Sequence, residues 1–459
     1  MKIKVCNRIL FFLCVAALFF TGINRVNREE KIENNNMLES NPSQNRCMSG
    51  RMTDDSKAED VNRPGSIKIE QGEKKVNPSN YVRVLVKSQN FEHAYHDQVI
   101  LQFNSETTVE ETETIFHAGE KIHLDNTSSM INTGESITLI PVDETMGFTL
   151  LSLTRAQGNP TYEGQIIIYR TKDGYQIINY VELETYLCYV IPSEMPSGYE
   201  QQALAAQAIC ARTYAWRKMQ EGSEGEGVAD GKADVDDSVM YQVYNNIERG
   251  KSTDEAVAET KGIIMTCEGS PITAYFFSTS SGSTSTNEVW SQEPVEYLQC
   301  VSTGTLEAQD PWYRWEVSFT MEELTRRARD YGIEDLQTLE IIDKSDGGAV
   351  TSLKLRGVHE EYTLLGELGV REFLKTKDIA IKRHDGTVVC DMDILPSAYI
   401  SLEYQYDEQG EEICLIKGGG YGHGVGMSQN GANHLAQQGR TWDEILHYFY
   451  RKIDLDSIL

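Results

Sequence analysis

The sequence predicts an α+β protein: a mixed helical and β-rich core with an inserted β-rich subdomain, behind an N-terminal membrane anchor and a flexible tether. Three observations lead to this prediction. Short β-branched runs separated by turn residues fill the chain from Tyr81 to Ile178. Apolar residues at helical spacing follow them from Leu183 onward. Strand-like runs then return between Thr260 and Leu355, before a glycine-rich stretch and two short helical patterns.

Residues 1–23 are predicted to be a signal anchor. Lys2, Lys4 and Arg8 precede an uncharged apolar run from Ile9 to Phe20. A basic segment before a short apolar run is typical of an export signal, and no Ala-x-Ala cleavage pattern follows it. The run is short for a membrane span of about 20 residues, so a cleaved signal remains the alternative. We expect a single-pass protein of the cell membrane with its body outside the cytoplasm.

Residues 24–80 are predicted to be a flexible tether, because they are polar, rich in Asn, Glu, Lys and Ser, and without apolar periodicity. The whole chain of 459 residues carries 42 Lys and Arg against 70 Asp and Glu, a net charge of −28 at pH 7. This charge excludes nucleic acid as an expected partner, since non-specific binding needs basic residues to neutralise phosphates. The apolar fraction of 40% is enough to build a core.

Residues 81–165 are predicted to form a β-rich N-terminal region, and residues 166–459 the main domain. The strand predictions rest on β-branched runs bounded by turn residues. These runs are Tyr81–Val86, Gln98–Leu101, Ile137–Ile140, Gly164–Tyr169 and Gly174–Ile178.

Two helices are predicted next, each from a capping-box pattern before apolar or Ala-rich sequence. Asn179 and Glu182 form the first pattern, and Pro192 is expected to end that helix. Ser197 and Glu200 form the second pattern, ahead of an Ala-rich run with high helix propensity.

Glu194 is the best catalytic candidate in the sequence. It lies between the two predicted helices, in a loop that Pro192 and Pro196 fix on either side. Partial burial there would raise its pKa and let it hold a proton near neutrality, as a general acid requires. The alternative is an ordinary solvated glutamate of a loop.

The middle of the chain alternates between loops and strands. The acidic, glycine-rich stretch Glu221–Asp237 is predicted to be a solvated flexible loop. Strand-like sequence returns from Thr260 to Phe277. Leu339–Leu355 is predicted to be a hairpin turning at Asp346-Gly347-Gly348, and Val370–Leu374 a short helix.

The C-terminal part carries six glycines in the nine positions of Gly418–Gly426, which indicates unusual dihedral angles or a close approach of the backbone. Within this stretch, His423 is either a catalytic or binding group or a structural histidine bonded to the backbone. We expect the Gly418–Gly431 segment to lie beside Glu194 and to offer backbone amides to a ligand. A helix is predicted to end at Gly439, and Thr441 with Glu444 to cap the last helix.

Several familiar motifs are missing from the sequence. It has no G-x-x-x-x-G-K-[ST] loop, no H-E-x-x-H pair and no G-x-S-x-G elbow, which disfavours nucleotide-driven chemistry, zinc proteolysis and standard serine hydrolysis. The nine cysteines form no C-x-x-C pair. Five of them lie in apolar surroundings and are expected to be free, with disulfides as the alternative: Cys188, Cys210, Cys267, Cys300 and Cys414. Five aromatic residues are candidates for stacking on sugar rings, with core packing as the alternative. They are Trp290, Tyr297, Trp312, Tyr313 and Trp315.

Five blocks occur in order across about residues 166–450. They are Val181–Pro196, Ala203–Ala215, Ala274–Gly282, Leu395–Ser397 and Gly422–Ala432. Together they resemble the SpoIID/LytB domain family, and residues 166–459 are identified as a catalytic domain of this type. The resemblance implies a lytic transglycosylase that acts in the sporulating cell during engulfment. It implies cleavage of peptidoglycan glycan strands between N-acetylmuramic acid and N-acetylglucosamine, after a partner cell-wall amidase has removed the stem peptides.

The resemblance also implies roles for single residues. Glu194 falls on the family's catalytic glutamate, which serves first as acid and then as base. The expected substrate-binding residues are Arg212, Tyr275, Ser280, Gly282, His423 and Gln429. No cofactor is implied. Some relatives hold zinc with His and Cys near a Gln-Val-Tyr segment, but Met240–Tyr244 has neither nearby, so no metal is expected. The alternatives are a non-catalytic, glycan-binding amidase enhancer of the same family and a purely structural link between membrane and wall.

Overall fold

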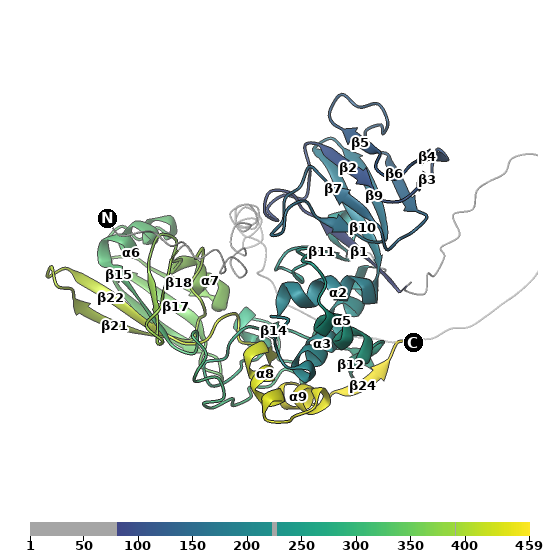
Figure 1. Cartoon of the computed structure of the whole chain (residues 1–459). Coiled ribbons are helices and arrows are strands. Elements are labelled where there is room, and N and C mark those ends of the chain that lie inside the picture. The colour runs from purple at the N-terminus through teal and green to yellow at the C-terminus, as the bar shows by residue number, and fades with distance from the viewer. Residues whose placement is uncertain (1–79, 223–226, 391) are drawn as a thin grey trace, which may run out of the picture. The chain divides into compact units, whose positions relative to one another are not determined.

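The computed structural model describes residues 80–222, 227–390 and 392–459 (Figure 1). Helices and strands are mixed along the chain, in agreement with the predicted α+β class. The predicted anchor, residues 1–23, and nearly all of the predicted tether, residues 24–80, lie outside the described residues. Among the residues that are described, no helix combines the length and the apolar character needed to cross a membrane.

A seven-stranded sheet in the order β11-β1-β10-β9-β6-β3-β4 contains most of the strands predicted in the first half of the chain. Neighbouring strands run antiparallel, except that β1 and β11 are parallel. The sheet consists of β1 (Tyr81–Val86), β3 (Thr107–Val109), β4 (Thr114–Phe116), β6 (Ser136–Pro141), β9 (Gln165–Thr171), β10 (Gly174–Glu182) and β11 (Val235–Asp236). The boundary expected at residue 165 therefore falls inside a sheet, because β9 and β10 pair with strands from the region before it.

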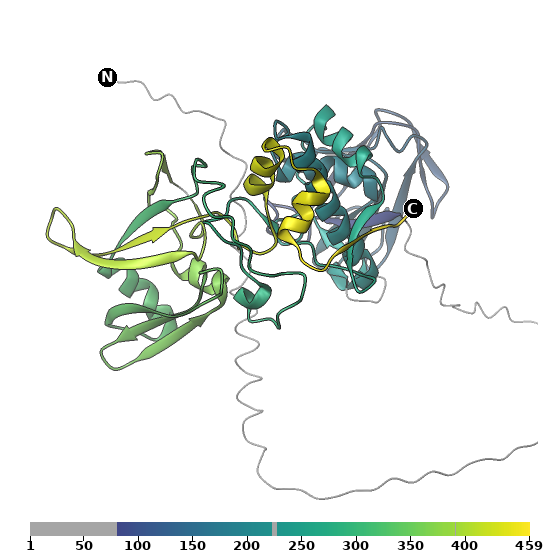
Figure 2. The same ribbon diagram turned by 90° about the horizontal axis from the view of Figure 1, so that it is seen from below.

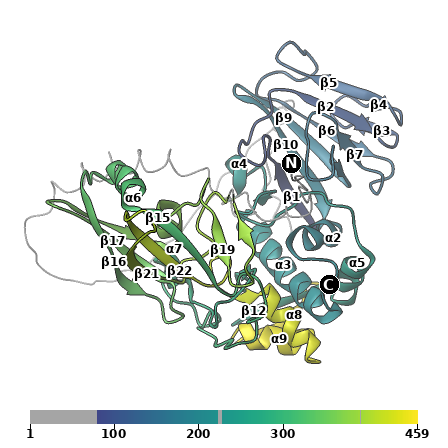
Figure 3. The same ribbon diagram turned by 60° about the vertical axis from the view of Figure 1, so that its left-hand side comes forward.

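A second sheet, in the order β5-β2-β7-β8, packs against the first (Figure 3). It consists of β2 (Val99–Phe103), β5 (Lys121–Leu124), β7 (Phe148–Leu150) and β8 (Thr161–Tyr162). Alternate residues of β2 are buried, and Val99, Leu101 and Phe103 join Val84 and Ile168 of the first sheet in one core. This alternation is the pattern of strands with one face turned inward.

The helical centre of the protein is built around α3 (Gln201–Glu221), which is buried along most of its length. Its alanines, among them Ala205, Ala208 and Ala211, are fully buried and let neighbouring helices approach closely. Four helices contact α3; Figure 2 shows two of them, α8 and α9, in yellow. The four are α2 (Leu183–Glu194), α5 (Lys251–Glu259), α8 (Gln429–Gln437) and α9 (Trp442–Phe449).

The predicted start and end of α2 were wrong. Asn179 lies in β10, where its side-chain amide donates hydrogen bonds to the backbone carbonyls of Glu163 and Gln165, so it caps no helix. Pro192 lies inside α2, which continues to Glu194. Proline lacks an amide hydrogen, so the helix loses the hydrogen bond from residue 192 to the Cys188 carbonyl, and it ends only two residues later. The Ser193 hydroxyl bonds to the Tyr189 carbonyl at 2.7 Å, which adds a hydrogen bond to this last turn.

Of the other predicted helix ends, one was wrong and two follow the sequence. The second capping box was wrong, since Glu200 is the N-cap of α3 and no side chain caps it. The capping box of Thr441 and Glu444 is confirmed at the start of α9, with both of its hydrogen bonds present. Helix α8 ends at Gln437, and Gly439 has the positive φ of +87° that suits a residue following a helix.

The predicted β-rich insertion has its own hydrophobic core. It leaves the helical centre after β14 (Phe276–Phe277) and returns at β23 (Met427–Ser428), and these two short strands pair in parallel. The hairpin predicted at Leu339–Leu355 is confirmed by β16 and β17. The insertion consists of β15 (Trp315–Thr320), α6 (Met321–Ala328), β16 (Leu336–Lys344), β17 (Val350–Gly357), β18 (Glu361–Leu365), α7 (Gly366–Phe373), β19 (Ile381–Arg383), β20 (Val388–Val389), β21 (Ile400–Tyr406) and β22 (Glu412–Gly418).

The end of the acidic stretch, predicted to be a solvated loop, is instead buried beside the first sheet. Asp234, Asp236 and Asp237 form ion pairs with basic residues of the N-terminal region. The shortest pairs, Arg83–Asp234 and Arg155–Asp237, both have N–O distances of 2.6 Å. These acidic residues are buried because they pair with cationic residues more than seventy positions away in the chain. A local charge pattern in the sequence cannot reveal such partners.

We predict that Asp237→Ala destabilises the protein by about 3–5 kcal/mol, because it leaves the buried guanidinium of Arg155 without its carboxylate. Glu255→Ala is the matched control, since the Glu255 side chain is 58% exposed and its pair with Lys251 is stretched to 3.6 Å. Urea unfolding of both variants measures the difference. Equal stability of the two variants would contradict a structural role for the buried pair.

Candidate active site

Glu194 is the last residue of α2 and not part of a loop, and it is half-buried. Its Oε1 accepts a hydrogen bond from the backbone amide of Val243 at 2.6 Å. Its own backbone carbonyl accepts one from the side-chain amide of Gln429 at 3.1 Å. Both the carboxyl group and the helix end that carries it are therefore held by other segments.

Burial raises the pKa of Glu194 to about 7, although the Val243 amide, by bonding to the ionised form, acts in the opposite direction. Near neutral pH this carboxyl group is therefore divided between its acid and base forms. The Val243 amide occupies Oε1, so Oε2 is the oxygen left to exchange a proton with a ligand. A group with these properties can donate a proton and later accept one.

Val243 belongs to a segment fixed on both sides. Gln242 donates to the Ala211 carbonyl of α3 at 3.1 Å and accepts from the Tyr186 hydroxyl of α2 at 3.3 Å. Tyr244 donates from its hydroxyl to Asn179 of β10 at 3.0 Å. The sequence analysis missed this role, because a backbone amide leaves no signature in the choice of side chain.

The glycine-rich stretch adopts the unusual dihedral angles that its composition predicts. Gly420, Gly422, Gly424 and Gly426 all have positive φ angles, between +78° and +108°. Several amides of the stretch bond to protein acceptors, such as the amide of Gly422 to the Pro396 carbonyl at 3.0 Å. These bonded amides do not face a ligand, and the glycines let the backbone pack tightly. For the other amides of the stretch, contact with a ligand stays a prediction.

His423 stands among aromatic rings, with Tyr275, Phe277 and Trp290 around it. Its Nδ1 accepts a hydrogen bond from the Val425 amide at 3.0 Å, which assigns the ring proton to Nε2. Burial lowers its pKa to about 4, so the ring is neutral at physiological pH. Of the two alternatives for His423, the geometry favours a structural histidine bonded to the backbone.

Arg212 has no surface to offer a substrate. Its side chain is fully buried, and it makes a two-pronged ion pair with Glu184 at 2.7 and 2.8 Å. Its remaining N–H groups bond to Thr260 and to two backbone carbonyls. The expected substrate contact of Arg212 is therefore corrected to a role in joining α2, α3 and the end of α5.

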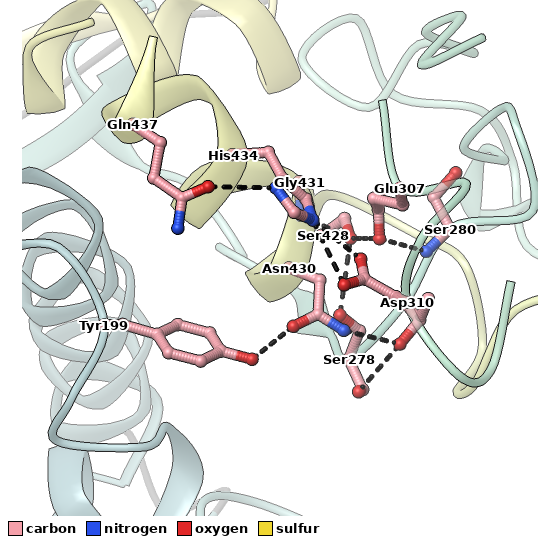
Figure 4. Close-up of polar contacts among 11 residues, drawn as sticks. Tyr199, Ser278, Ser280, Glu307, Asp310, Ser428, Asn430, Gly431, His434 and Gln437 are labelled. Atoms are coloured by element: carbon pink, nitrogen blue, oxygen red, sulfur yellow. Dashed lines mark hydrogen bonds and ion pairs between the residues drawn. The ribbon is translucent and has the colours of Figure 1, made fainter. Parts of the chain in front are cut away.

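Ser280 and Gly282 lie in a loop that is tied to a buried carboxyl group, Glu307, shown in Figure 4. The Ser280 amide and the Ser428 hydroxyl both donate to Glu307 Oε2, each at 2.8 Å. Gly282 has a φ of +120° and accepts two backbone hydrogen bonds through its carbonyl. Sequence reasoning missed Glu307, which stands in a run of turns without apolar periodicity.

The first turn of α8 brings several of these groups together. Ser428 caps the helix by accepting from the Gly431 amide at 3.2 Å, and Gln429 reaches the end of α2. Asn430 bonds to the Tyr199 hydroxyl and donates to Thr279 at 2.9 Å (Figure 4). Of the expected binding residues, the structure thus connects Gln429 directly to Glu194, and Ser280 to Gln429 through Glu307 and Ser428.

Another pair of titratable residues, His434 and Asp310, involves the same helix, α8. His434 Nε2 and a carboxylate oxygen of Asp310 are 3.0 Å apart, and Nδ1 of this histidine faces Gln437 (Figure 4). Across the described residues, no group of three or more His, Cys, Asp or Glu side chains is arranged to hold a metal ion.

Comparison with known proteins matches residues 171–267 to the model of the SpoIID family, described as "Stage II sporulation protein". Stage II sporulation protein D of Bacillus subtilis is 31% identical over 298 residues, which cover 62% of this chain and 77% of that protein. This chain belongs to the SpoIID family. Its matched segment contains Glu194, Val243 and the whole of α2 and α3.

Two further relatives and a second family model also match this SpoIID-family chain. Stage II sporulation protein D of Bacillus amyloliquefaciens is 29% identical over 302 residues, covering 63% of this chain and 78% of that protein. The amidase enhancer of Bacillus subtilis is 27% identical over 302 residues, covering 58% of this chain and 40% of that protein. A second family model, a domain of unknown function, matches residues 301–426, which include Glu307 and the inserted subdomain.

We predict that Gly426→Ala destabilises this SpoIID-family protein by about 2–5 kcal/mol. The residue has a φ of +78°, and an added Cβ would clash with the carbonyl oxygen of Tyr275. Gly439→Ala is the matched control, since Gly439 has a φ of +87° but open space around it, and should cost only about 1–2 kcal/mol. Equal unfolding midpoints in urea for the two variants would rule out the steric clash.

Proposed function

We propose that this protein is a peptidoglycan lytic transglycosylase that cleaves glycan strands between N-acetylmuramic acid and N-acetylglucosamine. The observation that carries the proposal is Glu194: a half-buried carboxyl group with a pKa of about 7 and one oxygen held by the Val243 amide. Membership of the SpoIID family supports this assignment, because Glu194 lies in the matched segment. The names of the two Bacillus relatives support a role in sporulation, for which we propose engulfment.

In the proposed reaction, Glu194 Oε2 donates its proton to the glycosidic oxygen while the bond from that oxygen to C1 of N-acetylmuramic acid breaks. The positive charge that develops at C1 is met by the C6 hydroxyl of the same sugar, and a new C1–O6 bond forms. The resulting carboxylate takes the proton of that hydroxyl. One carboxyl group therefore suffices, whereas glycosidases that activate water generally use two.

The neighbouring groups suit this exchange. The Val243 amide stabilises the ionised form, so it limits the rise in pKa that burial causes and keeps both forms accessible. Gln429 holds the backbone carbonyl of Glu194 and thereby the direction of the side chain. We also propose that the body acts outside the cytoplasm, tethered through residues 1–23, on strands from which a partner amidase has removed the peptides.

A second candidate is a non-catalytic module that binds glycan and enhances an amidase. The observation that favours it is the 27% identity to a protein named amidase enhancer. The two proposals differ in product, since only the transglycosylase releases 1,6-anhydro sugars. If the protein releases none but stimulates a purified amidase, the second candidate takes the place of the first.

We predict that Glu194→Gln keeps the fold and glycan binding but lowers the cleavage rate by about 10²–10⁴-fold or more. Glutamine has nearly the same shape and can still accept from Val243, yet it cannot exchange the proton. Mass spectrometry of digested, peptide-free strands measures the anhydro products. Glu200→Gln is the control, since Glu200 is exposed and its side chain caps nothing. Wild-type rates in the Glu194 variant would remove Glu194 from the reaction.

We predict that kcat/KM for cleavage falls as the pH rises through about 7, because the free enzyme must carry the proton on Glu194 before substrate binds. The sign follows from the acid role: above the pKa the carboxyl group is ionised and cannot protonate the leaving oxygen. Initial rates between about pH 5 and about pH 9 give the profile. A rate that stays constant through pH 7 would contradict Glu194 as the acid.

A further inference from the structure

Glu307 is a buried carboxyl group outside the segment matched to the SpoIID family, with 1% of its surface exposed. Its Oε2 accepts from the Ser280 amide and from the Ser428 hydroxyl, both at 2.8 Å (Figure 4). These two donors come from segments almost 150 positions apart, the loop after β14 and the first turn of α8. A single carboxyl group thus bridges two segments that form the candidate site.

The bridge is reinforced by backbone bonds on either side. The Asn430 amide donates to the Ser278 carbonyl at 3.0 Å, and the Asn430 side chain donates to Thr279 at 2.9 Å. Ser428 also accepts from the Gly431 amide and so begins α8. The first turn of this helix therefore has little freedom to rotate or to slide along the loop.

The same turn reaches Glu194. Gln429 directly follows Ser428, and its Nε2 donates to the Glu194 carbonyl at 3.1 Å. A path of hydrogen bonds and one peptide link therefore runs from Glu307 through Ser428 and Gln429 to the end of α2.

Stability alone does not explain a carboxyl group at this place. Glu307 Oε1 is buried and has no hydrogen-bond partner among the described residues, and such an atom costs free energy. A Cβ on Gly431 would approach this oxygen to 2.9 Å, so the glycine is needed to make room for it. An apolar residue of similar shape would avoid this cost. The carboxyl group at this place therefore points to a requirement for orientation.

We propose that Glu307 is a positioning residue for Glu194: it fixes the first turn of α8 to the loop after β14, and α8 in turn holds the last turn of α2 through Gln429. The expected effect of Glu307 on the cleavage rate rests on the proposed function. Its expected effect on the protonation of Glu194 does not. Glu307 lies in the region matched by the domain of unknown function, so the proposal gives that region a part in shaping the site.

Glu307 acts in its neutral form near pH 7, because burial raises its pKa to about 8. Three titratable groups face Glu307: Asp310, Tyr199 and Tyr448. The charge of Asp310 raises the pKa of Glu307 further. The charge of Glu307, when it is ionised, raises the pKa values of Tyr199 and Tyr448. His434 is paired with Asp310. Glutamine is therefore a close substitute at this position, since its carbonyl oxygen can accept the same two hydrogen bonds.

The first experiment follows the titration of Glu194 by carboxyl ¹³C NMR of glutamate-labelled protein, with the signal assigned from its loss in Glu194→Gln. Glu307→Ala and Gln429→Ala should each lower the pKa of Glu194, because a loosened helix end admits water. The double variant should shift it no further than the single ones, whereas Glu307→Gln should leave it at the wild-type value. An unchanged pKa in Glu307→Ala, or additive shifts, would overturn the proposal.

The second experiment measures cleavage of peptide-free strands by the same variants. Glu307→Ala and Gln429→Ala should each lower kcat by about tenfold with little change in KM, and the double variant should also lose about tenfold rather than a hundredfold. Glu307→Gln should restore most of the rate. A hundredfold loss in the double variant would mean that Glu307 does not act through Gln429, and so would overturn the proposal.

Controls separate positioning from general damage. Glu323→Ala removes a carboxylate that pairs with Arg326 and Arg327 inside the insertion, and should leave Glu194 unchanged. If Glu307→Ala does not fold, Ser428→Ala cuts the same link from α8 and must produce the same shift, or the proposal fails. If the wild type releases no anhydro product, the proposed function fails, while the NMR titration still decides the role of Glu307.

Discussion

The burial of α3 is the constraint on which the rest of the structure depends. Its small side chains allow α2, α5, α8 and α9 to contact it directly. This close packing brings the Val243 segment and the start of α8 each within hydrogen-bond distance of the end of α2. Larger residues on α3 would force these helices apart, because protein interiors tolerate little added volume. The geometry around Glu194 is thus set by the size of residues that touch no substrate.

Burial of carboxyl groups recurs in this strongly acidic chain and serves different ends. Asp237 is compensated by a guanidinium, although burial still raises its pKa to about 6. Among the described residues Glu194 and Glu307 have no cationic partner, and they are held by amide or hydroxyl donors instead. A carboxyl group without a counter-charge stays protonated to higher pH. Absence of a cation therefore favours the protonated form of Glu194 and Glu307 near neutral pH, whereas Asp237 is paired with a guanidinium.

Sequence patterns predicted the features that depend on near neighbours in the chain. The strand Tyr81–Val86, the hairpin Leu339–Leu355 and the cap at Thr441 all follow from local alternation or spacing. Glu194 could be selected because two prolines bracket it. The aspartates of the acidic stretch and Glu307 were missed because their partners are distant in the chain: Asp237 binds Arg155, 82 positions away, and Glu307 binds Ser428. No periodicity within a window of residues contains such information.

The insertion of the β-rich subdomain has a consequence for folding. Ser278 and Ser428 are 150 positions apart, yet they meet beside the two-residue pairing of β14 with β23. Closing so long a loop is costly in chain entropy unless the intervening segment has already become compact. The subdomain, with its own core, can provide this compaction. We therefore expect the helical centre to be completed only after the subdomain has folded, so that the segments around Glu194 are assembled in a nascent chain only once α8 has emerged.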